Sequence, residues 1–184
     1  MKAYLLAHLF LAPFLVFTIL AAFGYPLLGA AIGFTIGVIA CVRRYGMKLP
    51  PVFMGAQVLG VAVALILLLV TPSLKETTAF AVVFAFLAVG ALVSVINNKP
   101  WTAELSAADV GDFSENPAFI KANIFFSAMW ALTFAWFAFA NGQELAPVFR
   151  WMPMVMAGLI TIFGPKFLMK IAAKRGLMDG HSPK

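Results

Sequence analysis

The sequence predicts an all-α fold, a polytopic membrane protein built as a bundle of about six transmembrane helices. Hydrophobic residues make up 63% of the 184-residue chain and charged residues 11%, which leaves too few polar side chains to cover a soluble globule. The apolar residues gather in runs close to the ~20 residues that a helix needs to cross a ~30 Å hydrocarbon layer. Residues 1–184 are therefore expected to form a single transmembrane domain.

Turn-forming residues separate the apolar runs and set the expected helix boundaries. Gly24 ends the first run, and Pro26 then takes a first-turn position that suits proline. Pro51 opens the third helix, and Asn116 followed by Pro117 indicates an N-cap with proline at the first helical position. The expected helices cover 4–23, 26–42, 51–70, 78–96, 117–140 and 147–168.

The distribution of positive charge predicts the orientation. Of the 13 Lys and Arg residues, only Lys75 and Arg150 fall in the odd-numbered loops, and the others flank the N-terminus, the second and fourth loops and the tail. Short loops rich in Lys and Arg stay cytoplasmic, so both termini are expected to face the cytoplasm. Anionic lipid explains the net charge of +6 without a nucleic-acid partner.

The fourth loop, 97–116, is the largest segment outside the predicted spans. Trp101, Leu105 and Ala108 share one face at helical spacing, which predicts a short interfacial helix. The acidic residues of this segment are Glu104, Asp109, Asp112 and Glu115. Two interpretations remain open, a solvated connector and a docking surface for a protein partner.

Three glycines, Gly29, Gly33 and Gly37, recur every four residues on the second predicted helix. This spacing places them on one face, where the absence of side chains lets a neighbouring backbone approach closely. We expect this face to pack inside the bundle against the third helix. The expected contact residues are Ala56, Gly60 and Ala64. Homo-oligomerisation and pore lining are the alternatives.

Few polar side chains fall within the predicted spans. His8 and Gln57 lie near enough to the cytoplasmic interface to be satisfied there, and Asn123, Ser127 and Thr133 are expected to bond neighbouring helices or their own backbone. The centres of the spans contain neither Asp nor Glu, which disfavours proton-coupled transport. The sequence carries no catalytic constellation and no metal-ligand cluster, so we expect neither enzyme activity nor a cofactor.

A basic stripe follows the last predicted span. Lys166, Lys170 and Lys174 share a face at four-residue spacing, and Arg175 is adjacent to them. Each such charge contributes roughly 1 kcal/mol to attraction towards anionic lipid near the membrane surface. We therefore expect these four residues to contact membrane lipids.

A distinctive pattern covers the fourth loop and the helix after it. It consists of Asn98-Lys99-Pro100-Trp101-Thr102, the run from Asn116 to Asn123, and Trp130-Ala131-Leu132. This pattern resembles the intracellular septation protein A family of small bacterial inner-membrane proteins. The resemblance implies a role in cell-envelope synthesis or septation through an interaction partner. The residues expected to order the loop against the fifth helix are Lys99, Pro100, Trp101, Asn123 and Trp130.

Three functions stay open at this point. The first is an inner-membrane scaffold that binds a membrane-protein partner or a second copy of itself. The second is a small-molecule transporter or channel, which the glycines, the helix-breaking Pro13 and Pro165, and Gln57 would serve. The third is either a lipid-modifying enzyme, which a polar pocket at headgroup depth would favour, or an accessory subunit of a larger membrane complex.

The predicted orientation can be tested by accessibility. Engineered cysteines at Lys75 and Glu144 should react with a membrane-impermeant thiol reagent added outside intact cells, because both positions lie in outer loops. Cysteines at Lys48, Asp109 and Ser182 should stay unlabelled until the membrane is opened. Labelling of Asp109 from outside would overturn the six-helix topology.

Overall fold

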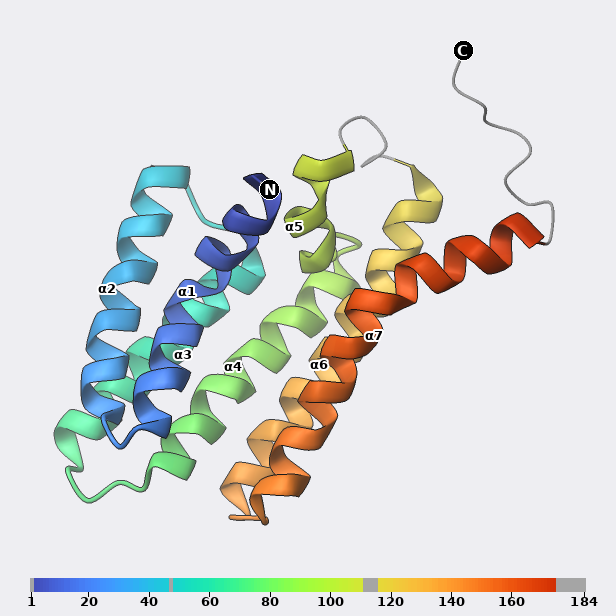
Figure 1. Cartoon of the computed structure of the whole chain (residues 1–184). Helices are drawn as coiled ribbons and strands as arrows, with labels where there is room; N and C mark the ends of the chain where they lie inside the picture. The colour runs from blue at the N-terminus through green and yellow to red at the C-terminus, as the bar shows by residue number, and fades with distance from the viewer. Residues whose placement is uncertain (1, 47, 111–115, 175–184) are drawn as a thin grey trace.

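The computed structural model describes residues 2–46, 48–110 and 116–174, and within them the chain forms seven α-helices and no strand (Figure 1). Side chains are described for 11–46, 48–105 and 116–164. The helices are α1 (Lys2–Ala22), α2 (Pro26–Tyr45), α3 (Val52–Val70), α4 (Glu76–Ile96), α5 (Trp101–Val110), α6 (Pro117–Gly142) and α7 (Pro147–Lys174). The predicted all-α fold is confirmed.

Among the described residues, five helices are long and apolar enough to cross a membrane. They are Pro26–Tyr45, Val52–Val70, Glu76–Ile96, Pro117–Gly142 and Pro147–Gly164. The side chains of α1 (Lys2–Ala22) are described only from Leu11 on, and the described part, Leu11–Ala22, is apolar. A sixth span through the whole of α1 stays a prediction. The architecture is therefore that of a helical polytopic membrane protein.

The helices pack around α4, which lies between α3 and α6. A hairpin of α1 and α2 covers α3, whereas α7 packs mainly on α6 and turns away from the bundle towards its C-terminal end (Figure 1). Phenylalanine rings fill the centre, where Phe84 meets Phe137 with ring centroids 4.1 Å apart and Phe134 at 5.9 Å. Because these rings come from α4 and α6, their contacts hold these two helices together at the centre of the bundle.

The glycine face of α2 packs against α1 rather than against the predicted residues of α3. A methyl group added at Gly29 would lie 2.9 Å from the carbonyl oxygen of Phe17, and one at Gly33 would overlap the carbonyl oxygen of Pro13. Gly37 also meets α3, where an added methyl group would lie 2.8 Å from Cγ2 of Val58. The predicted partner helix is therefore right in part, although the predicted contact residues are not the ones that these glycines meet. Gly60, expected to face these glycines, instead meets α4, where an added methyl group would lie 2.8 Å from Cβ of Phe86.

Gln57 lies fully buried inside the bundle, which corrects the expectation that it is satisfied at the membrane interface. Its Oε1 accepts a hydrogen bond from the backbone N–H of Phe14 at 3.2 Å. Proline at position 13 has no N–H and crowds the preceding turn of α1, so its neighbour's N–H benefits from an acceptor outside the helix. The side chain of His8 lies outside the described residues.

Replacing Gly33 with Leu should sharply reduce the yield of folded protein. The new side chain would enter the space held by the Pro13 carbonyl oxygen, and overpacking of this kind costs about 1 to 3 kcal/mol or more. Leu at Val38, which is 38% exposed on the same helix, is the matched control and should be tolerated. Size-exclusion profiles and thermal unfolding in mild detergent measure both, and equal tolerance at the two positions would contradict the close contact.

Candidate functional site

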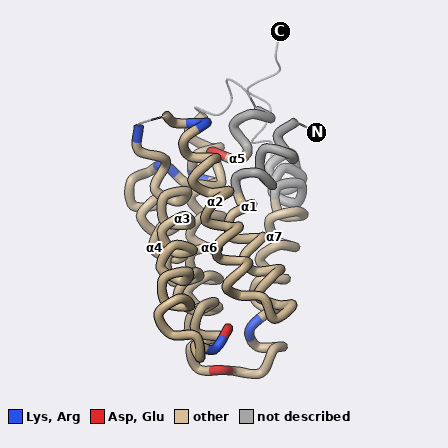
Figure 2. Tube along the Cα trace, turned by 90° about the vertical axis from the view of Figure 1, so that its left-hand side faces the viewer, with Lys and Arg blue, Asp and Glu red and all other residues tan. Residues whose placement is uncertain are grey.

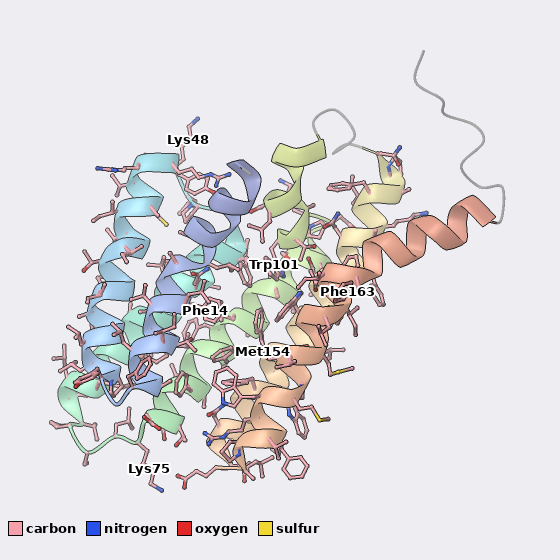
Figure 3. All side chains as sticks on the ribbon, in the orientation of Figure 1. Phe14, Lys48, Lys75, Trp101, Met154 and Phe163 are labelled. Carbon is pink, nitrogen blue, oxygen red and sulfur yellow. The ribbon has the colours of Figure 1, made fainter. Side chains whose placement is uncertain are left out.

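Charged residues lie at the two ends of the bundle, and the ends differ (Figure 2). At one end Lys75 Nζ lies 2.6 Å from Glu144 Oε1, which ties the α3–α4 loop to the α6–α7 loop. Lys48 and Lys75 mark the opposite ends, while Phe14 and Trp101 lie between them inside the bundle (Figure 3). We call the end that carries Lys48 and α5 the α5 end.

A tight reversal between α4 and α5 positions the site at the α5 end. Asn98 has φ 54°, a left-handed conformation that asparagine tolerates better than most residues. The N–H of Lys99 then donates to the carbonyl oxygen of Ser94 at 2.9 Å. Pro100 is buried directly after this turn, and α5 begins at Trp101. The chain thus folds back over the end of α4 and carries Trp101 into the bundle.

Hydroxyl groups from two other helices cap the start of α5. The N–H of Trp101 donates to Ser94 Oγ of α4, and the N–H of Thr102 donates to Ser127 Oγ of α6, each at 3.3 Å. Thr102 Oγ1 donates to the carbonyl oxygen of Asn123 at 2.9 Å. The first N–H groups of a helix have no partner inside it, so these bonds satisfy donors that would otherwise be left open. They also fix α5 in position against α4 and α6.

Trp101 anchors α5 in the core, not at the membrane interface as the sequence suggested. Only 4% of its surface is exposed, and its ring stacks on Phe53 of α3 with centroids 4.2 Å apart and planes at 10°. Trp130 of α6 approaches its edge at 6.4 Å. The predicted short helix in 97–116 is therefore confirmed as α5, but its first turn enters the bundle.

The structure brings the predicted loop residues Lys99, Pro100, Trp101, Asn123 and Trp130 to this same end, with different roles. The side chain of Asn123 donates to the Phe119 carbonyl of its own helix at 2.9 Å, and only its backbone carbonyl holds α5. As predicted, Ser127 bonds another helix and Thr133 bonds its own backbone at Met129.

Sequence reasoning missed Ser94 altogether. A serine inside an apolar helix usually donates to its own backbone, as Ser94 Oγ does to the carbonyl oxygen of Ala91. Nothing in the sequence indicates that the same hydroxyl also accepts from the N–H of Trp101.

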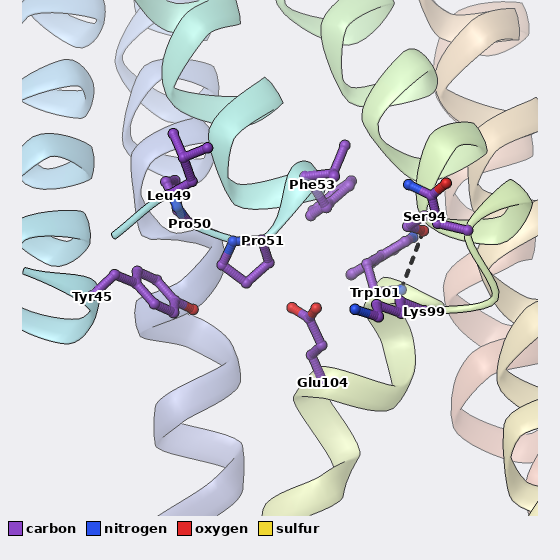
Figure 4. Close-up of a pocket in the computed structure, with 11 residues that line it drawn as sticks. Tyr45, Leu49, Pro50, Pro51, Phe53, Ser94, Lys99, Trp101 and Glu104 are labelled. Carbon is purple, nitrogen blue, oxygen red and sulfur yellow. Dashed lines mark hydrogen bonds between the residues drawn. The ribbon is translucent and has the colours of Figure 1, made fainter. Parts of the chain in front are cut away.

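A pocket of about 610 Å³ opens beside α5, between the end of α2, the loop before α3, the end of α4 and the first turn of α5 (Figure 4). Its apolar wall comes from residues 49–53, and Tyr45, Lys99 and Glu104 add polar groups. A second hollow of about 270 Å³ shares Lys99 and Glu104 with it. The volume of the first pocket falls within the ~300 to 1,000 Å³ typical of small-molecule sites.

Glu104 is the polar group most perturbed by this environment. Its carboxylate points into the pocket (Figure 4), and among the described residues it makes neither a hydrogen bond nor an ion pair. Burial raises the pKa of Glu104 to about 6, against the opposing influence of Arg44 and Lys99. A half-buried carboxylate with a displaced pKa in a pocket is a candidate functional group.

Other predicted features lie outside what the structure describes. The side chains of Lys166, Lys170, Lys174 and Arg175, and those of Asp109, Asp112 and Glu115, are among them. Within the described part of the chain, no three His, Cys, Asp or Glu side chains come together as a metal site. Comparison with protein-family models, curated proteins and solved structures finds no match to this chain.

Replacing Glu104 with Gln should stabilise the protein at pH 7.5. The folded-state pKa of about 6 exceeds the ordinary 4.5, so ionised Glu104 opposes folding, and this penalty grows as pH rises from 4.5 to 6 and is complete above it. The expected gain is at most about 1 kcal/mol, because solvent screens a partly exposed group. The gain should vanish below about pH 4.5.

Thermal unfolding in mild detergent at pH 7.5 and pH 4.5 measures the effect. Glu76→Gln, at an exposed carboxylate in the first turn of α4, gives the baseline for removing a carboxylate outside the pocket. A Glu104→Gln protein less stable than the parent at pH 7.5 would show that the carboxylate has a stabilising partner.

Proposed function

We propose that the protein is a non-catalytic interaction scaffold of the bacterial inner membrane, and that the α5 end is its binding surface. The observation that carries the proposal is the capping of α5 by Ser94 and Ser127, together with the burial of Trp101. These contacts hold the α4–α5 segment in one position before any partner arrives. A preordered surface loses less conformational entropy on binding, which favours a stable complex.

The distribution of charge supports the cytoplasmic location of this surface. Arg43, Arg44, Lys48 and Lys99 gather at the α5 end, as the positive-inside rule requires of a cytoplasmic face. On this orientation both termini are cytoplasmic. The acidic residues that follow Glu104 in α5 and after it would then meet a basic partner, either another membrane protein or a second copy of this chain.

The resemblance to the intracellular septation protein A family supports a role in cell-envelope synthesis or septation. It rests on residues 98–102, 116–123 and 130–132. Two of these segments supply Trp101, Thr102 and the Asn123 carbonyl, which meet at the start of α5. The residues that carry the resemblance are thus also those that order the proposed surface.

The transporter alternative has less support. Three of the residues that suggested it have packing roles, since Gln57 accepts a bond from Phe14, and Gly33 and Pro13 form a helix contact. Aromatic rings of α4 and α6 fill the centre of the described bundle. Transport would therefore need a substantial rearrangement of the core.

Charge reversal tests the scaffold. Changing Asp109, Asp112 and Glu115 together to Lys should strongly reduce recovery of co-purified envelope proteins, because rim charges govern partner choice. Membrane insertion should be unaffected, since these residues lie outside the spans predicted from the sequence. Quantitative affinity purification in mild detergent, followed by mass spectrometry, measures recovery.

The matched control is a charge swap at the opposite end, Lys75→Glu with Glu144→Lys, which preserves that ion pair and should leave recovery unchanged. Gln57→Leu tests the transporter alternative, because it changes a residue that transport would use and leaves the charged loop intact. Unchanged partners after loop reversal, combined with a solute flux that Gln57→Leu abolishes, would refute the scaffold and favour the transporter.

A further inference from the structure

The pocket at the α5 end carries two opposite charges that are not paired with each other. Glu104 and Lys99 both line it, and Figure 4 shows their charged ends facing one another. Yet the ion pair found among the described side chains is Lys75 with Glu144, at the other end of the bundle. Two unpaired charges of opposite sign beside one cavity are complementary to a ligand that carries both signs itself.

We propose that this pocket binds a zwitterionic group made of a primary ammonium and a phosphate, as in a phosphoethanolamine headgroup, with the ammonium at Glu104 and the phosphate at Lys99. Such a site goes beyond the scaffold function, because it needs no protein partner. A scaffold could exist without the site, and the site without the scaffold.

The carboxylate of Glu104 suits a primary ammonium. An ionised carboxylate only accepts hydrogen bonds, and a primary ammonium donates three, whereas a trimethylated ammonium donates none. Charge-assisted bonds of this kind are about twice as strong as neutral ones, and partial burial strengthens them further. Glu104 has no such donor among the described residues, and a primary ammonium in the pocket would provide one.

Cations beside Glu104 suit the phosphate. Lys99 borders both the 610 Å³ pocket and the 270 Å³ hollow beside the first turn of α5. Arg44, at the end of α2, is near enough to act on the Glu104 carboxylate electrostatically. Lys and Arg are the usual protein partners of phosphate oxygens.

The depth of the pocket points to a lipid as the source. It lies where the candidate spans α2 and α4 end and α3 begins, which is the level of the headgroups in a bilayer. Leu49, Pro50 and Pro51 form an apolar wall there, suited to the glycerol and upper acyl carbons of a lipid. Free phosphoethanolamine offers the same charged groups without that apolar part.

Ligand titration tests the proposal. The protein in mild detergent at pH 7.5 is titrated with dihexanoyl lipids bearing phosphoethanolamine, phosphocholine or phosphoglycerol headgroups, and with free phosphoethanolamine, by calorimetry or native mass spectrometry. The phosphoethanolamine lipid should bind most tightly. Glu104→Gln should weaken it by roughly 10- to 100-fold, as expected for loss of a charged hydrogen bond. Lys99→Gln should also weaken it.

Two exposed residues provide matched controls, Glu76→Gln at the opposite end and Lys48→Gln at the same end. Neither should change binding. Thermal unfolding at pH 7.5 confirms that each variant is folded.

Each outcome has a definite meaning. Tight binding of the lipid with much weaker binding of free phosphoethanolamine supports the site and assigns it to lipid, and equal binding supports the site with a soluble ligand. Equal binding of the phosphocholine or phosphoglycerol lipid, or a Glu104→Gln protein that binds like the parent, would overturn the proposal. Partner recovery in the charge-reversal experiment is independent of all these results.

Discussion

The backbone N–H of Phe14 donates to the side chain of Gln57, and this bond between α1 and α3 helps to organise the first half of the molecule. In hydrocarbon an unsatisfied backbone group costs several kcal/mol, and Pro13 disturbs the hydrogen-bond ladder of α1 at this point. Gln57 of α3 supplies the acceptor, while Gly33 of α2 lets a second helix touch the Pro13 carbonyl. One proline thus draws α1, α2 and α3 to a common point, and the polar amide at that point is structural.

The position of α3 then determines the site at the α5 end. Phe53, in the first turn of α3, is the platform on which Trp101 stacks, and it also lies 6.1 Å from Phe134 of α6. From α4 and α6, Ser94 and Ser127 complete the arrangement by capping α5. The pocket therefore forms where the α1–α3 group meets the α4–α6 pair, and each of its walls is fixed by contacts inside the bundle.

Caps, prolines and apolar runs in the sequence predicted where most helices lie. They did not predict most of the contacts between helices. Asn116 was expected to cap α6, and its Oδ1 accepts from the Ala118 N–H at 2.8 Å. The end expected at residue 42 was wrong, because Arg43 to Tyr45 continue α2 until Gly46 turns with φ 60°. The role of Gln57, the partner of the α2 glycines and the pocket all depend on residues distant in sequence, which neither periodicity nor turn chemistry can bring together.

Two carboxylates show why the α5 end is the place to look for function. Glu144 is about half exposed and paired with Lys75, an arrangement that typically contributes about 0 to 1 kcal/mol. Glu104 is half-buried, faces a pocket and has a pKa raised to about 6 by desolvation, so its charge opposes folding at neutral pH. The stacking of Trp101 and the caps on α5 hold Glu104 there against that penalty. Packing alone would be better served by an uncharged side chain, whereas the proposed ligand would give this carboxylate a partner.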